Sequence, residues 1–427
     1  MKKYIPKTLA AMMVLASVST ACVKDKFDYY GYEDQLEGYF PVDSIDSQHT
    51  WTLMSNTSTF IQGSVPGAYK LQLLSGNPFE ESGVEVLAES FTGSSISKNM
   101  TFVSAPHISS VYVAVLDEDG NYLSLTKGKV GGEITLDNDV PSGTANSITP
   151  QEIFYGYEAD YPNPGDWDYN DVVLSLSKEL TSETTVDVHV TLWAVGYLTQ
   201  IGAAMRWVGQ QYDQVKDKVK VTSETSFMTT PEVSCTFFTG EWSDFQKSRS
   251  GEFVINLFDD AHIAIFHLAE DGSAYRRYFN TYNTITSSNG AAKQPAKTVT
   301  YTFTFDNEYE ARNFSLDELD PFIIVQYGTS GSNFWEVHSY PYKLSEVLFS
   351  YYGGAASSYN NGFSWAVAIP YTHFLWPEEA TPIGQRKQSI VAGAYQESAH
   401  SFGEWILNRN TARDWYLYPA SGAVYNR

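Results

Sequence analysis

Residues 158–177 read EADYPNPGDWDYNDVVLSLS, and the rest of the chain is organised around them. Its centre, residues 166–171 (DWDYND), places three carboxylates and an amide within six positions. The apolar run 172–174 follows directly, and polar and apolar residues then alternate to Ser177. An alternating pattern of this kind predicts a β-strand. The acidic run therefore lies in a loop that leads into a strand.

Three side chains of this loop, Asp166, Asp168 and Asn170, recur at every second residue. In a loop that wraps, this spacing brings their oxygens around one hard cation. Calcium accepts about six to eight oxygen ligands at ~2.3–2.6 Å. The pattern therefore predicts a Ca²⁺ site. The alternative is a solvated acidic turn before a strand, because Asp, Asn, Gly and Pro favour turns.

The spacing does not fit the loop of an EF-hand. The sixth position is Asp171 where that loop needs Gly, and the twelfth is Ser177 where it needs a bidentate Glu. A strand follows instead of a helix, so a different kind of loop would hold the ion. Asp171 and the upstream residues Glu158 and Asp160 are candidate further ligands. No Lys or Arg lies between Gln151 and Ser177, so a cation would relieve the repulsion among these acids.

The acidic loop also resembles the signature of the LruC domain family. That signature is an acidic pair, a short spacer and an Asp-aromatic-Asp-aromatic-Asn-Asp run. The matching segment here is Tyr157-Glu158 followed by residues 165–173. The resemblance runs from about Ile148 to the C-terminus. It implies an all-β extracytoplasmic module, mostly lipid-anchored in bacteria, and it supports the cation site without implying an established activity. Further matching segments are 320–323 (DPFI), 335–338 (WEVH), 365–366 (WA), Pro370, 376–378 (WPE), 393–395 (GAY), 402–405 (FGEW) and 414–416 (DWY).

Length and composition indicate a globular protein of two or three domains. The chain has 427 residues, and domains usually span ~100–200 residues. The aromatic content of 15%, with 30 Tyr and 10 Trp, favours β structure and also suits surfaces that face carbohydrate. The net charge of −23 makes nucleic acids and anionic membrane surfaces poor partners.

The N-terminus predicts a lipoprotein signal peptide over residues 1–21. Three Lys residues precede a short apolar core, residues 9–16, which is too short to span a bilayer. Small residues then lead into Cys22, as in a lipobox, although Ser19 stands where Leu is usual. We therefore predict that Cys22 carries lipid, that residues 22–48 form a tether, and that the protein is an outer-membrane lipoprotein facing the periplasm or the cell surface. A plain secretory peptide cleaved near Ala21 is the alternative.

Short sequence patterns lead to interpretations of two further single residues, Cys235 and Ser44. Cys235, the second of two cysteines, lies in a strand-like run and is interpreted as a buried small hydrophobe, so no disulfide framework is expected. Ser44, in the tripeptide Asp43-Ser44-Ile45, matches a short motif for protein O-glycosylation in some diderm bacteria. Ser44 is therefore a candidate glycosylation site.

The pattern of strands and turns predicts an all-β fold of two β-sandwich-like domains. Residues 49–140 read as strand, turn, strand and form the first domain. A Gly-, Ser-, Asn- and Pro-rich stretch, Asp137 to Pro150, marks the boundary. Residues 148–427 form the larger, LruC-like domain. Apolar residues at helical spacing predict a short amphipathic helix over Ala394–Leu407.

The function that fits these features is non-enzymatic. The sequence contains no Gly-x-Ser-x-Gly, Walker or dinucleotide motif and no Cys/His metal cluster. We therefore expect a lipid-anchored, calcium-stabilised module for adhesion or for capture of a glycan or protein ligand, with the oligomeric state left open. The alternative is a secreted carbohydrate-active hydrolase that uses a carboxylate pair such as Glu336 and Glu378. Glu336 and His338 share a strand face, which a cross-strand polar network explains equally well.

Overall fold

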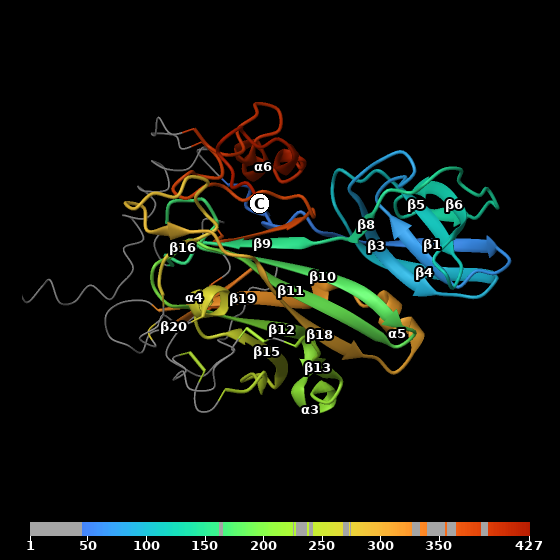
Figure 1. Cartoon of the computed structure of the whole chain (residues 1–427), viewed down its shortest axis with the longest axis horizontal. Coiled ribbons are helices and arrows are strands. Elements are labelled where there is room, and N and C mark those ends of the chain that lie inside the picture. The colour runs from blue at the N-terminus through green and yellow to red at the C-terminus, as the bar shows by residue number, and fades with distance from the viewer. Residues whose placement is uncertain are drawn as a thin grey trace, which may run out of the picture.

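The computed structural model describes residues 45–161, 165–224, 226–227, 237–238, 242–267, 273, 275–326, 334–339, 355–356, 364–385 and 392–427. Within them the chain is all-β, as predicted, with four sheets and only short helices. Figure 1 shows a small unit, coloured blue to teal, beside a larger unit. The signal peptide with Cys22, the candidate glycosylation site Ser44, and Cys235 lie outside the described residues.

The small unit is a sandwich of two sheets around one apolar core. Alternating residues of both sheets, such as Ile61, Leu71 and Val113, point into this core and are fully buried. The first sheet has the order β4 (Ser95–Ser104), β1 (Ser55–Ser64) and β7 (Glu133–Thr135). The second has the order β6 (Tyr122–Lys129), β5 (Ser110–Leu116), β2 (Lys70–Leu74), β3 (Val84–Phe91) and β8 (Ile148–Pro150).

The large unit also packs two sheets around a single core, to which Leu174, Met205 and Ile323 contribute. One sheet has the order β13 (Val219–Val221), β18 (Lys297–Thr304), β11 (Thr185–Val195), β10 (Val172–Ser182), β9 (Ile153–Tyr157) and β22 (Ala366–Pro370), with β16 (Tyr278–Phe279) on β11 and β17 (Ala291–Ala292) on β16. The other has the order β14 (Phe245–Lys247), β15 (Glu252–Phe258), β12 (Ile201–Gln211), β19 (Leu319–Gln326), β20 (Phe334–His338) and β21 (Ala355–Ala356).

Short helices lie at the ends of strands. Asn307 caps α5 by accepting a hydrogen bond from the backbone N–H of Glu310, and Asp260 caps α4 in the same way from His262. The helices are α3 (Tyr212–Val215), α4 (Ala261–Phe266), α5 (Glu308–Asn313) and α6 (Phe402–Leu407), with 3₁₀ turns η1 (Leu316–Glu318) and η2 (Trp415–Leu417).

The chain enters the large unit before it forms the small one. Trp51 and Leu53 are fully buried in the core of the large unit. The backbone N–H of Leu53 donates to the carbonyl of Ala368 at 3.0 Å, beside an isolated parallel bridge between Thr52 and Ala368. After the small sandwich the chain returns through β8, which pairs in parallel with β3. The small unit is thus inserted between two segments that the large unit holds.

Polar contacts fix the two units against each other. Glu308 on α5 accepts hydrogen bonds from Lys98 at 2.5 Å and from Ser90 at 3.0 Å, both in the small unit. Glu89 of β3 accepts from the backbone N–H of Leu180 at 3.0 Å. Near this contact, Lys178 donates a hydrogen bond to the carbonyl of Phe314. Burial lowers the pKa of this lysine to about 8. Because these groups are largely removed from water, the contacts favour one relative orientation.

The predicted helix over Ala394–Leu407 is too long. Helix α6 begins at Phe402, where the side chain of Ser401 accepts a hydrogen bond from Glu404 and so caps the helix. The preceding segment is held by distant partners instead: the N–H groups of Ala394 and Tyr395 donate to the carbonyls of Pro382 and Ile383, both at 2.8 Å. The apolar residues of this segment recur because they contact the core, not because the backbone is helical.

Helix α6 closes one end of the large unit and contacts the start of the described chain (Figure 1). The carbonyl of Ile406 accepts from the backbone N–H of Asp46 at 2.9 Å, and Arg409 forms an ion pair with Asp46 at 3.0 Å. The side chain of His49 contacts the carbonyl of Trp405 at 3.1 Å. The segment around Asp46 and His49 therefore packs directly against helix α6, and the contacts stabilise both.

Candidate functional site

The acidic loop connects two adjacent antiparallel strands, β9 and β10, whose ends meet at the pair Val172 and Tyr157. Its backbone is left-handed at every second position, with φ of 65° at Gly165, 70° at Trp167 and 53° at Tyr169. Such angles are unfavourable for large side chains. The rings of Trp167 and Tyr169 are buried in the core, which holds the loop in this conformation. The curled backbone lets the acidic side chains at intervening positions converge.

Three carboxylates meet in this loop. Glu158, Asp166 and Asp168 each place one oxygen so that the three oxygens lie within 4.8 Å of one another. Two ligands on opposite sides of Ca²⁺ lie roughly 4.6–5.2 Å apart, twice the usual ligand distance. Glu158 and Asp168 are fully buried and Asp166 is half-buried. The spacing of the oxygens therefore suits a calcium ion.

The backbone positions the two buried carboxylates. Glu158 Oε1 accepts from the N–H of Tyr169 at 2.8 Å. Asp168 Oδ1 accepts from Asn170 at 3.0 Å, and its Oδ2 accepts from Ala380 at 2.9 Å. The other oxygen of Glu158, Oε2, is buried without a hydrogen-bond partner among the described residues. A buried carboxylate oxygen without a partner is costly, so it points to a missing ligand.

The glycine at position 165 makes room for this oxygen. A Cβ atom at Gly165 would lie 2.0 Å from Glu158 Oε2, so the carboxylate would have to move away from its present position. Its φ of 65° also falls in the left-handed region that favours glycine. Both the conformation and the space therefore require glycine at this point of the loop.

The other predicted ligands, Asp160, Asn170 and Asp171, form hydrogen bonds that stabilise the loop. Asp171 Oδ2 accepts from the N–H of Ala159 at 2.6 Å, and Asp160 Oδ1 accepts from the hydroxyl of Tyr197 at 3.0 Å. Asn170 donates through Nδ2 to the carbonyl of Pro377 at 3.1 Å, while its Oδ1 is buried without a partner in the described part of the chain. The structure therefore brings Glu158, Asp166 and Asp168 into one group and places the other three beside it.

A carboxylate that the sequence analysis missed lies next to the group. Glu379 precedes Ala380, whose N–H holds Asp168, and its own N–H donates to the carbonyl of Thr281 at 2.9 Å. Its Oε2 is buried with no partner among the described residues. The sequence analysis considered the adjacent Glu378, which instead accepts from the N–H of Asn283 at 2.8 Å. No spacing pattern links position 379 to the loop, since more than two hundred residues separate them.

The acids make this a strongly negative site. Burial, and then the neighbouring carboxylates, raise the pKa of Glu158, Asp168 and Asp171 well above the usual range. Burial and Asp166 raise the pKa of Glu379 to about 8. Each shift means that the folded site disfavours the charged carboxylates when no cation is bound. A divalent cation would reverse this preference.

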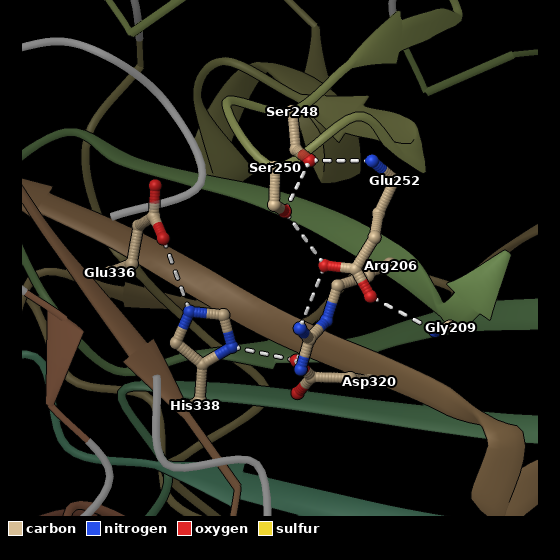
Figure 2. Close-up of polar contacts among 8 residues, drawn as sticks. All are labelled: Arg206, Gly209, Ser248, Ser250, Glu252, Asp320, Glu336 and His338. Carbon is tan, nitrogen blue, oxygen red and sulfur yellow. Dashed lines mark hydrogen bonds and ion pairs between the residues drawn. The ribbon is translucent and has the colours of Figure 1, made fainter. Parts of the chain in front are cut away.

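A second buried group of charges lies on the other sheet and is drawn in Figure 2. His338 contacts Asp320 through Nδ1 at 2.9 Å and Glu336 through Nε2 at 3.2 Å. Arg206 forms ion pairs with Asp320 at 3.0 Å and Glu252 at 3.2 Å. Burial alone would lower the pKa of His338, but Asp320 and Glu336 outweigh it and raise the pKa to about 9.

This second group joins four neighbouring strands, with Glu252 at the start of β15. Arg206 lies on β12, Asp320 on β19 and His338 on β20, which pair in that order. Its carboxylates alternate with an arginine and a protonated histidine, so opposite charges are paired across the sheet. Two segments that share the LruC resemblance, 320–323 and 335–338, supply the contact between Asp320 and His338. The cross-strand polar network expected for Glu336 and His338 is therefore present, and it includes Asp320 and Arg206 as well.

The described residues include no helix that is both long and apolar enough to cross a bilayer. No curated protein matches the chain. Among solved structures, a candidate lipoprotein from Bacteroides ovatus aligns with a TM-score of 0.48 and 14% identity, covering 84% of this chain and 99% of that one.

A family model described as a domain of unknown function, DUF4842, matches residues 184–416. The match includes the network around His338 and the residue Glu379, but it begins after the acidic loop. Because it spans more than half of the 427 residues, the chain belongs to the DUF4842 family.

Proposed function

We propose that the protein is a lipid-anchored cell-envelope module, LruC-like in its larger unit, in which Ca²⁺ stabilises the β-sandwich for adhesion or ligand capture. The observation that supports this most directly is the convergence of Glu158, Asp166 and Asp168 within 4.8 Å, with one buried oxygen lacking a partner. Glu379, which lies beside Asp166, is a further candidate donor.

The donor set favours calcium over other divalent ions. Every donor in the group is a carboxylate oxygen, and hard cations prefer oxygen, whereas zinc prefers nitrogen and sulfur ligands. Magnesium keeps several waters and requires near-ideal octahedral geometry at ~2.0–2.1 Å. A buried, irregular set of carboxylates from a curled loop suits the larger and more flexible calcium shell.

The bound ion would join segments that are distant in sequence. Glu158 follows β9, Asp168 precedes β10, and Glu379 lies on the segment that leads to the C-terminal helix. Hydrogen bonds from Asn170 to Pro377 and from Ile383 to Trp167 already bring these segments together. The ion's role is therefore structural: it neutralises the acids and ties the loop to the C-terminal segment.

The first prediction concerns this site. Asp168→Asn removes a central ligand charge while keeping the shape of the side chain, so Ca²⁺ affinity should fall by at least about tenfold. Titration calorimetry measures the affinity, and thermal melting should show stabilisation of the wild type by ~2.7 kcal/mol at a hundred times Kd. The matched control is Asp119→Asn in an exposed hairpin turn, which should bind as the wild type does. Wild-type melting that is unchanged by calcium and by chelator would refute the proposal.

The second prediction concerns the anchor. Cys22 carries lipid in the mature protein, because small residues precede it at the end of a signal peptide. Mass spectrometry of the N-terminal peptide should show an acylated cysteine at position 22. Cys22→Ala should release the protein from the outer-membrane fraction. A mature N-terminus at another residue, or a variant that stays in the membrane, would contradict the prediction.

A further inference from the structure

The carboxylates leave part of a calcium shell for other ligands. Glu158, Asp166 and Asp168 offer three donors, with Glu379 beside them, whereas calcium takes about six to eight oxygens. Both oxygens of Asp168 and one of Glu158 already accept backbone hydrogen bonds. Bidentate coordination by these two side chains is therefore disfavoured. At least two positions would remain for oxygens that the four carboxylates do not supply.

The open positions lie on one side of the group. Glu158 and Asp168 are fully buried, whereas Asp166 and Glu379 are both half-buried. Solvent therefore reaches the group past Asp166, whereas Glu158 and Asp168 face the core. Any additional ligand must approach from this exposed side.

Two tyrosines stand beside Glu379. Tyr278 and Tyr282 are half-buried, and their rings pack edge to face with centroids 5.6 Å apart. The loop that carries them is bonded to the site, because the carbonyl of Thr281 accepts the N–H of Glu379 at 2.9 Å. The hydroxyl of a tyrosine is neutral at neutral pH and can donate a hydrogen bond. The exposed side of the group therefore has aromatic surface next to it.

The charge of the site selects a neutral ligand. Four carboxylates outweigh the two charges of calcium, and the whole chain carries −23, so anionic ligands are repelled. A pair of adjacent hydroxyls can replace two waters on calcium without adding charge. The carbon face of a sugar then packs on an aromatic ring, which carries a large apolar surface and a polar end.

We infer that the calcium ion also binds a neutral glycan through two vicinal hydroxyls, with Tyr278 and Tyr282 contacting the sugar ring. The inference rests on the proposed calcium site and names the ligand that the site captures. It predicts that glycan binding requires calcium, whereas calcium binding does not require the tyrosines.

The test measures retention of the detergent-solubilised mature protein on immobilised neutral polysaccharides: mannan, β-glucan and galactan. We expect retention on at least one of them in calcium, with a loss of at least about tenfold in chelator or in Tyr282→Ala. Tyr282→Phe should keep part of the binding. The matched control is Tyr309→Ala, which removes an exposed tyrosine on α5 and should have no effect.

Thermal melting separates the two proposals. If Tyr282→Ala and Tyr278→Ala keep the calcium-dependent rise in melting temperature but lose glycan, both proposals stand. If the wild type shows that rise yet binds none of the three polysaccharides, or if both tyrosine variants bind as the wild type does, the glycan inference is wrong and the calcium site remains. If the rise itself is absent, both fail.

Discussion

Single residues decide the character of the acidic loop. Gly165 has to be glycine because a methyl group there would collide with Glu158 Oε2, and Trp167 and Tyr169 hold an unfavourable backbone through their buried rings. Such strain persists only where the surrounding structure fixes it, and it is commonly found at ligand sites. The loop is therefore built to bring carboxylates together despite their repulsion.

The third prediction concerns His338. Its folded pKa of about 9 exceeds the ordinary value of 6.5, so its stabilising effect is complete below about pH 6.5 and is lost as the pH rises through about 9. The shift corresponds to about 3 kcal/mol. His338→Gln should be strongly destabilised and should lack this loss, as urea unfolding at several pH values would show.

The comparison between variant and wild type isolates this histidine. Lys178, whose pKa is lowered to about 8, acts in the opposite direction, because the folded state gains stability as the pH rises from about 8 toward its unfolded value. Lys178 is present in both proteins, so its contribution cancels. An equal pH dependence of both proteins would contradict a charged His338.

Sequence reasoning identified the carboxylates of the group that lie close together in the chain and missed the distant one, Glu379. Asp166 and Asp168 share a local spacing, and Glu158 lies just upstream. Glu379 reaches the group only because the segment after β22 folds back against the loop, and no local pattern encodes this return. For the same reason, the sequence analysis considered only Glu336 and His338, which lie on one strand. It did not identify their neighbours Asp320 and Arg206 on the adjacent strands.

At the scale of elements, alternation predicted the strands well. The alternation that starts at Val172 after the acidic loop continues as β10, because one face of the strand meets the core. The helix over Ala394–Leu407 was overestimated because aromatic contacts on several sides produced the same spacing as a helix. Tyr395, which lies outside any helix, stacks on Phe374 and meets Trp415 edge to face.

The fourth prediction concerns α5 and the interface between the units. Glu308 bonds Lys98 and Ser90 of the small unit and also pairs with Arg312. Glu308→Ala leaves these donors without their acceptor, so we expect a loss of about 1–3 kcal/mol in unfolding free energy. Urea unfolding measures this, with Glu183→Ala in an exposed turn as the control. Equal stability of the two variants would mean that the contact is immaterial.

At the scale of the whole molecule, the acidic group should govern stability against pH when calcium is removed. The fifth prediction is that, in chelator, the melting temperature falls as the pH rises from about 5 to about 8, because carboxyls with raised pKa favour the protonated folded state. Calcium should reduce this fall, since it takes the place of the protons. The His338 network contributes equally with and without calcium, so the difference between the two series reports the acidic group. A difference that stays constant over this pH range would count against the site.

The early entry of the chain into the large unit determines where a mechanical load acts. If lipid holds Cys22, a pull on the protein passes along residues 23–44, which reach at most roughly 75 Å, to Asp46 and Trp51. These residues are fastened to α6 and β22, so the tension enters the large unit directly. The small sandwich lies off this load path and stays unstretched while the anchor is pulled. With the anchor fastened in this way, a pull on residue 22 would load the large unit before the small one.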